Sequence, residues 1–97
     1  MALTDQTIAL YERLVHQEGR QELTPDLATA YLNKAAAVRA LPDHRAVVTL
    51  CDRAIALYEP LVQGEGREEF RSVLARTLDQ RAHSLLALRL VLEPPTT

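Results

Sequence analysis

The sequence predicts an all-α protein built from two copies of one helical unit. Residues 8–41 and 55–88 align without a gap at an offset of 47, and 16 of these 34 positions are identical. Apolar residues recur at helical spacing in both copies, and no useful stretch alternates with the period of two that is typical of a strand. A length of 97 residues fits one domain. We therefore expect residues 1–97 to form a single helical-repeat domain of four antiparallel helices.

The first copy predicts helices over about residues 4–18 and 25–41. Thr4 is expected to cap the first helix, because its hydroxyl can accept a hydrogen bond from a free backbone N–H group. The run Thr24-Pro25-Asp26 predicts a second start, with a capping hydroxyl, then a proline at the first helical position, then an acid. Pro42 ends the second helix, since the residue before a proline is displaced from the α region.

The second copy predicts helices over about residues 43–63 and 67–92. Pro42 opens the third helix, and Pro94-Pro95 stops the fourth. The four expected helices are thus joined by short connections, and consecutive helices run in opposite directions.

A Glu-Gly-Arg triplet follows both the first and the third expected helix, at residues 18–20 and 65–67. A left-handed residue after a helix is inexpensive only for glycine, so Gly19 and Gly66 are expected to have positive φ. The Glu and Arg of each triplet are expected to pair weakly on the surface. We interpret both triplets as connectors and not as binding sites.

The apolar stripes predict the core, and in each copy one cation lies at the edge of a stripe. Lys34 and its repeat mate Arg81 both fall beside the apolar face, where a cation needs a partner. We expect a structural ion pair in preference to a ligand-binding cation, with Lys34 near Glu12, Glu59 or Asp52. The residues expected in the core are Tyr31, Val38, Val47, Cys51, Ala54, Ile55, Tyr58, Leu74, Leu78 and Leu85.

Residues 27–60 resemble a tetratricopeptide repeat. Ala35 stands where this family favours a small residue for close helix approach, Asp43 follows the turn, Ala54 occupies a small position of the second helix, and Pro60 closes the unit. The resemblance implies a short α-solenoid that binds a protein or peptide on its concave face, which the first helix of each pair builds. The period of 47 residues exceeds the 34 of the family.

The resemblance also indicates candidate partner-binding residues on the second and fourth helices. Asn33 matches a position at which some members of the family hold a peptide backbone, and its repeat mate Gln80 can likewise donate and accept hydrogen bonds. The full candidate set is Thr29, Leu32, Asn33, Ala36, Arg39, Arg76, Asp79, Gln80 and His83.

The end of the fourth helix predicts an oligomer interface. Seven of the eight residues from 85 to 92 are apolar, so the helix is apolar around its whole circumference there. Leu86, Leu90 and Leu92 are expected to form an exposed apolar patch that marks an interface. A symmetric homodimer through this helix is the expected assembly, since two-fold pairs are the commonest. Stacking against the first helix of a neighbour and a different protein partner remain alternatives.

Composition argues against several classes of function. The chain has 11 Lys and Arg against 13 Asp and Glu, for a net charge of −2, whereas binding of nucleic acid needs a basic surface. Its single cysteine excludes a disulfide framework within the chain and a zinc site made of several cysteines. It has no metal-binding histidine pair, nucleophile elbow or phosphate-binding loop, so we expect neither a cofactor nor catalysis.

We expect a cytoplasmic protein without a membrane span, because no apolar run is long enough and the N-terminus lacks a signal peptide pattern. Ten arginines against one lysine are typical of a GC-rich bacterial genome. The leading function is a non-catalytic protein–protein interaction or scaffold module. One alternative is a small ligand-binding or enzymatic bundle that uses His83, Arg76 and Asp79, which a closed polar cavity would favour. Another is a piece of a longer array that is kept for its structure.

Overall fold

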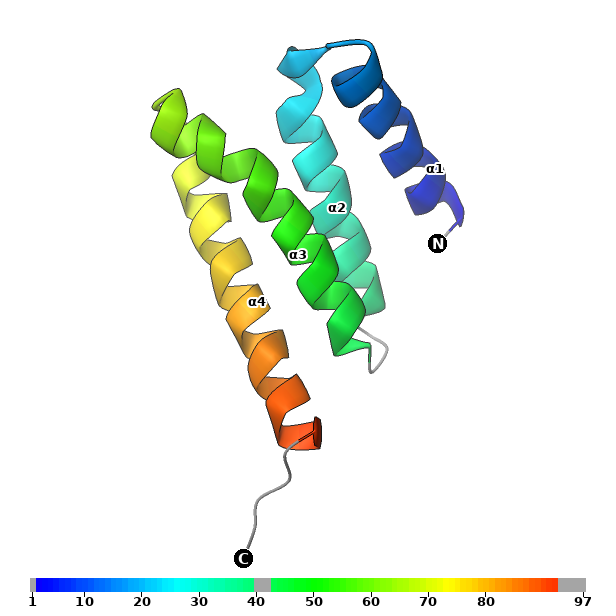
Figure 1. Ribbon diagram of the computed structural model, residues 1–97, viewed down its shortest axis with the longest axis vertical. Coiled ribbons are helices and arrows are strands. Elements are labelled where there is room, and N and C mark those ends of the chain that lie inside the picture. Colours follow the sequence, from blue (N-terminus) through cyan, green and yellow to red (C-terminus); the bar gives the residue numbers. More distant parts are fainter. Residues whose placement is uncertain (1, 40–42, 93–97) are drawn as a thin grey trace, which may run out of the picture.

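The computed structural model describes residues 2–39 and 43–92, and the side chains of residues 4–39 and 43–89. It contains the helices α1 (Ala2–Glu12), α2 (Thr24–Val38), α3 (His44–Glu59) and α4 (Arg71–Leu92). Figure 1 shows them side by side in chain order, each antiparallel to the one before, and consecutive helices pack together. No strand occurs in the described ranges, so the all-α prediction is confirmed.

The connections after α1 and α3 have matching secondary structure. Each starts with a π-helical turn that continues the helix, η1 (Arg13–Gln17) and η3 (Pro60–Gly64). Each ends with a 3₁₀ turn before the next helix, η2 (Gln21–Leu23) and η4 (Glu68–Phe70). The two turns of the second connection therefore lie 47 residues after those of the first, which is the offset that relates the two halves of the sequence.

The backbone of the two connections matches in detail as well. Gly19 and Gly66 have φ of 67° and 66°, which confirms the prediction for both glycines. One residue later, the N–H of Arg20 donates to a carbonyl oxygen at 2.8 Å, as does the N–H of Arg67. The acceptors, Leu14 and Leu61, are also repeat mates, so the same loop is built twice.

Two predicted helix starts are wrong. The first helix already begins at Ala2, so Thr4 lies inside its first turn and is not the cap. The last α-helix begins at Arg71 and not near residue 67, because a 3₁₀ turn occupies the preceding residues. Pro25 does lie in the first turn of α2, but Thr24 is the first helical residue and not the predicted cap, since Leu23 is the N-cap and makes no side-chain capping bond.

The third helix starts as its sequence indicates. Asp43 is the N-cap of α3, and its carboxylate accepts a hydrogen bond from the N–H of Ala46 at 3.1 Å. This bond satisfies one of the N–H groups that the first turn of a helix leaves without a partner. The predicted end of the second helix at Leu41 and the predicted opening at Pro42 lie outside the described residues.

Most of the predicted core is buried, and two leucines are the exceptions. Leu78 is 45% exposed and Leu85 is 39% exposed, so both predictions are wrong. The two residues lie on one face of α4 that no described element covers. The predicted core residues that are buried are Tyr31, Val38, Val47, Cys51, Ala54, Ile55, Tyr58 and Leu74.

Lys34 forms the structural ion pair that was expected, but with a different partner. Its ammonium group lies 2.6 Å from a carboxylate oxygen of Asp5 on α1, and its side chain is half-buried. The expected partners Glu12, Glu59 and Asp52 are therefore wrong. Lys34 sits on α2, so this pair joins the first two helices.

Two of the expected partners are used elsewhere. Glu12 accepts a hydrogen bond from the Tyr31 hydroxyl, and Asp52 pairs with Arg81 between α3 and α4. Asp52 and Arg81 each lie 47 positions after their counterparts, Asp5 and Lys34. The ion pair that joins α1 and α2 thus has an equivalent between α3 and α4.

Candidate functional site

An open groove lies between α2 and α4, and α3 forms its floor. We call it the α2–α4 groove. It encloses about 410 Å³, and its walls come from two helices that are not adjacent in the chain. The residues that line it are Leu32, Ala35, Ala36, Arg39, Cys51, Val73, Arg76, Thr77, Asp79 and Gln80.

A hydrogen bond joins the two walls of the groove. The Arg39 guanidinium of α2 donates to the side-chain oxygen of Gln80 on α4 at 2.9 Å. Helical spacing brings these residues there, because Leu32, Ala36 and Arg39 lie three or four residues apart and so share one face of α2. The same spacing places Arg76 and Gln80 together on α4.

The floor of the groove is apolar and chemically inert at neutral pH. Cys51 is fully buried, and burial raises the pKa of its thiol, with a further contribution from the neighbouring Asp52 carboxylate. A neutral thiol is a weak nucleophile, so Cys51 acts here as a small apolar residue. Thr77 is also buried, and its hydroxyl donates to the carbonyl oxygen of Val73 at 2.7 Å.

The rim of the groove is polar and carries a small positive excess. Arg39 and Arg76 provide two guanidinium groups, and Asp79 provides one carboxylate. Gln80 adds an amide that can donate and accept. This combination suits a segment that carries backbone amides together with a carboxylate, while the apolar floor favours small side chains.

The structure gathers most of the predicted partner-binding residues in this groove, but not all of them. His83 lies in an adjoining hollow with Leu86. Asn33 lies on the other side of α2, in a small hollow with residues of α1. Thr29 does not line the groove either, and its hydroxyl is hydrogen-bonded to the hydroxyl of Tyr58 on α3 at 3.2 Å. The predicted residues that line the groove are Leu32, Ala36, Arg39, Arg76, Asp79 and Gln80.

Sequence reasoning missed part of the groove wall and floor. Val73 and Thr77 line the groove, but their repeat mates are Asp26 and Ala30, so the repeat gives no signal for them. Cys51 was expected only in the core. That prediction is correct for its burial, and Cys51 nevertheless lies at the bottom of the groove between α2 and α4.

The candidate interface residues at the end of α4 are described only in part. Leu86 is 57% exposed, as expected for a residue of an apolar patch. The side chains of Leu90 and Leu92 lie outside the described residues. Leu78 and Leu85 are also exposed on this helix, so the uncovered apolar surface extends further toward its start than the sequence predicted.

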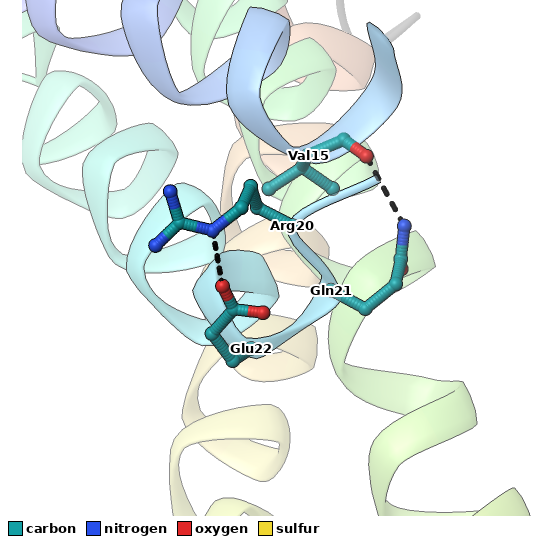
Figure 2. Close-up of polar contacts among 4 residues, drawn as sticks. All are labelled: Val15, Arg20, Gln21 and Glu22. Atoms are coloured by element: carbon teal, nitrogen blue, oxygen red, sulfur yellow. Dashed lines mark hydrogen bonds and ion pairs between the residues drawn. The ribbon is translucent and has the colours of Figure 1, made fainter. Parts of the chain in front are cut away.

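The connection between α1 and α2 is held by local contacts. Figure 2 shows Arg20 paired with Glu22, and the side-chain amide of Gln21 donating to the carbonyl oxygen of Val15 at 3.1 Å. The expected pair of Glu18 with Arg20 is therefore wrong. Hydrogen bonding to Arg20 lowers the pKa of the Glu22 carboxyl, but both groups are exposed, so the pair adds little stability. These contacts fit a connector.

Comparisons with protein families, curated protein sequences and solved structures give no match for this chain. Within the described residues, no helix is long and apolar enough to cross a bilayer. The described part of the chain also contains no cluster of three or more histidine, cysteine or acidic side chains that could hold a metal ion.

Proposed function

We propose that this protein is a non-catalytic interaction module that binds a segment of another protein in the α2–α4 groove and associates with itself through α4. The observation that carries the proposal is the groove itself, which is open and has an apolar floor and polar walls from two helices. An open groove of this kind suits a chain segment, whereas small-molecule sites are enclosed and bury most of the ligand.

We further propose that the fold is a short α-solenoid of two 47-residue repeats, similar to the tetratricopeptide type. The support is local and specific. The two connections share one backbone, and the ion pairs Asp5–Lys34 and Asp52–Arg81 recur at the same offset. In such arrays each unit contacts its neighbours, and the inner face of the stack binds the partner.

The rim charges indicate the partner's chemistry. A segment with small apolar side chains and at least one carboxylate matches the apolar floor and the guanidinium groups of Arg39 and Arg76. Because these rim charges are exposed, added salt should weaken binding. The alternative of a closed catalytic or ligand pocket has less support, because Arg76 and Asp79 line an open groove and His83 lies in an adjoining hollow.

Selection from a displayed random peptide library tests the groove. Peptides retained by the wild-type protein are retested by titration calorimetry against Arg76→Ala combined with Gln80→Ala, and against Arg45→Ala as a control. Arg45 is an exposed arginine at the start of α3 and does not line the groove. We expect the groove variant to lose at least about tenfold in affinity, equivalent to ~1.4 kcal/mol, and the control to bind normally.

A library that yields no binder, or binders that the groove variant retains at full affinity, contradicts the proposed site. Self-association is tested separately by light scattering of the wild-type protein over a range of concentrations. A mass that rises above the 10.8 kDa of one chain supports it. A constant monomer mass contradicts that part of the proposal without affecting the groove.

A further inference from the structure

One face of α4 is uncovered, although the same face of α2 is buried. We call Ala75, Leu78, Ala82 and Leu85 the open α4 face. Leu78 and Leu85 are 45% and 39% exposed, and both alanines are exposed. Their repeat mates on α2 are Ala28, Tyr31, Ala35 and Val38, which are exposed by only 0%, 4%, 3% and 6%. Equivalent positions, two of them occupied by the same residue type, are therefore buried on α2 and exposed on α4.

The cover on α2 is α3. The hydroxyl groups of Thr29 and Tyr58 are hydrogen-bonded across these two helices, and the Arg53 guanidinium lies 5.9 Å from the centre of the Tyr31 ring. The side of α3 that carries Tyr58 thus matches the face of α2. The chain itself supplies an example of what fits a face of this kind.

The repeat places the equivalent positions of this side of α3 on α1, where they are more exposed. We call Thr4, Thr7, Leu10 and Tyr11 the open α1 face. Thr7 and Leu10 are exposed, Leu10 by 54%, while Thr4 and Tyr11 are half-buried. Their mates on α3, 47 residues later, are Cys51, Ala54, Leu57 and Tyr58, and each mate is more buried than its counterpart on α1.

We propose that the open α4 face of one copy binds the open α1 face of a second copy, head to tail, in the way that α2 binds α3 within the chain. This inference rests on the self-association in the proposed function and names its mode. It differs from a symmetric α4–α4 dimer, because each copy uses two different surfaces. Contacts of this kind produce open chains or closed rings.

The pattern of side-chain sizes supports this pairing. Ala75 and Ala82 leave shallow positions on α4 on either side of Leu78, as Ala28 and Ala35 do around Tyr31. The facing positions on α1 are Thr4 and Thr7, which are small like their mates on α3. Small residues on both helices let the two axes approach closely, with Leu78 and Tyr11 of the next copy filling the space between them. A symmetric pair of α4 faces would lack a counterpart of Tyr58, whose mate on the open α1 face is Tyr11.

The second copy would also complete a second binding groove. Asn33 lies in a hollow with Thr4, Thr7 and Ala30 beside α1. The repeat mates of Asn33, Thr4 and Ala30 are Gln80, Cys51 and Thr77, which all line the α2–α4 groove. This hollow therefore has the floor and one wall of a groove, and α4 of the preceding copy would supply the other wall. Asn33 would then take part in binding, as its mate Gln80 does in the first groove.

Two variants, each blocked on one side, distinguish head-to-tail association from a symmetric dimer. The first combines Leu78→Glu with Leu85→Glu on the open α4 face. The second combines Thr7→Glu with Leu10→Glu on the open α1 face. Three of these four residues are exposed large apolar side chains and the fourth is an exposed threonine, so the variants should fold, which circular dichroism checks. Sedimentation velocity then measures each variant alone and in an equimolar mixture.

We expect each variant alone to sediment as a 10.8 kDa monomer, and the mixture to form a species of twice that mass that grows no further. Only a head-to-tail contact predicts this, because the mixture retains one intact α4 face and one intact α1 face. If the α1-face variant still dimerises alone, the head-to-tail mode is overturned while self-association through α4 stands. If the wild-type protein is monomeric throughout, both are overturned.

A photo-crosslink gives a second measurement that does not depend on how well the charged variants fold. A benzophenone amino acid replaces Leu78, and the protein is mixed with an isotope-labelled wild-type copy before irradiation. Mass spectrometry should locate adducts between unlabelled α4 and labelled α1, within residues 2–17. Adducts confined to labelled α4 would overturn the proposal in favour of the symmetric dimer, and the absence of adducts between copies would overturn it altogether.

Discussion

Two leucines one turn apart on α4 provide a direct test of which face of this helix is packed. Leu74 is 7% exposed and Leu78 is 45% exposed, yet both are leucines near the start of the same helix. Replacing either by alanine removes the same atoms and changes helix propensity equally. Any difference in the free energy of unfolding therefore reports the surroundings of the two side chains.

The expected losses follow from burial. Leu74→Ala removes a buried side chain and leaves a cavity, so it should lower the free energy of unfolding by about 2–5 kcal/mol. Burying a whole leucine side chain is worth about 1.5–3 kcal/mol, and Leu78 keeps roughly half of that because about half of it is in water. No closed cavity forms at the surface, so Leu78→Ala should cost about 1 kcal/mol.

Urea unfolding followed by circular dichroism measures both losses. The protein must be dilute, at a concentration where light scattering shows monomers, so that a second copy does not cover Leu78. With a slope of about 1–3 kcal/mol per molar urea, the midpoint should fall by about 0.7–5 M for Leu74→Ala and by about 0.3–1 M for Leu78→Ala, and at any one slope the first shift should be at least about twice the second. Equal losses in dilute solution would refute the reasoning, because they would mean that the chain itself buries Leu78.

Three further predictions concern single side chains and backbone positions. Ser84 is 1% exposed and its hydroxyl has no hydrogen-bond partner among the described residues, so Ser84→Ala should leave the thermal midpoint unchanged or raise it, and a clear fall would reveal a hidden partner. Gly66→Ala should cost about 1–2 kcal/mol in chemical unfolding because φ there is 66°, whereas Gly64→Ala, at ordinary φ and in open space, should be neutral or slightly stabilising; equal effects would contradict the backbone argument. Burial, together with the hydrogen bond to Glu12, raises the pKa of Tyr31 from 10.0 to about 12. The stability due to this raised pKa is fully present below pH 10 and is lost as the pH rises to about 12. Absorbance titration should show one phenol ionising late, and Tyr31→Phe should remove that component.

The sequence predicted most where a local rule was sufficient. The positive φ of Gly19 and Gly66 followed from the need for a left-handed residue after a helix, and the identical triplets implied identical loops. The start of α3 after Asp43 follows a similar local signal, whereas α1 ends at Glu12 and a π-helical turn fills the rest of the predicted helix. Thr4 failed as a cap because α1 begins two residues earlier, and capping residues show where a helix can start but not where it must.

Partners of charged side chains were harder to predict, because they depend on the rotation of one helix against another. Lys34 was expected near an acid, and it is, but Asp5 was not among the candidates. The repeat could have identified it. Arg81 pairs with Asp52, which was one of the candidates considered for Lys34, and subtracting 47 from both numbers gives Lys34 with Asp5. Applying the offset to pairs of residues, and not only to single positions, would have found the contact.

Part of the groove lining coincides with the candidate residues because a helical face is a local property, whereas the choice of neighbour is not. Spacing along α2 and α4 placed Leu32, Arg39 and Gln80 on faces away from the core, and the structure brings these faces to one groove. The same reasoning placed Asn33 with them, but Asn33 lies on the α1 side of α2. Two repeat mates occupy the same position around their helices, but the helices that lie beside them can differ.

Helix α4 shows most clearly how far a repeated sequence can be read. Leu78 and Leu85 were placed in the core because their mates Tyr31 and Val38 belong to a buried stripe, and the periodicity was read correctly. What the pattern specifies is a face suited to a neighbouring helix. It does not specify which chain provides that helix, since the burial of Tyr31 and Val38 depends on neighbouring helices and not on α2 itself. An apolar face that is buried in one repeat and open in the next is therefore the basis of the proposed interface, and α1 of every copy carries the surface that we propose to fit it.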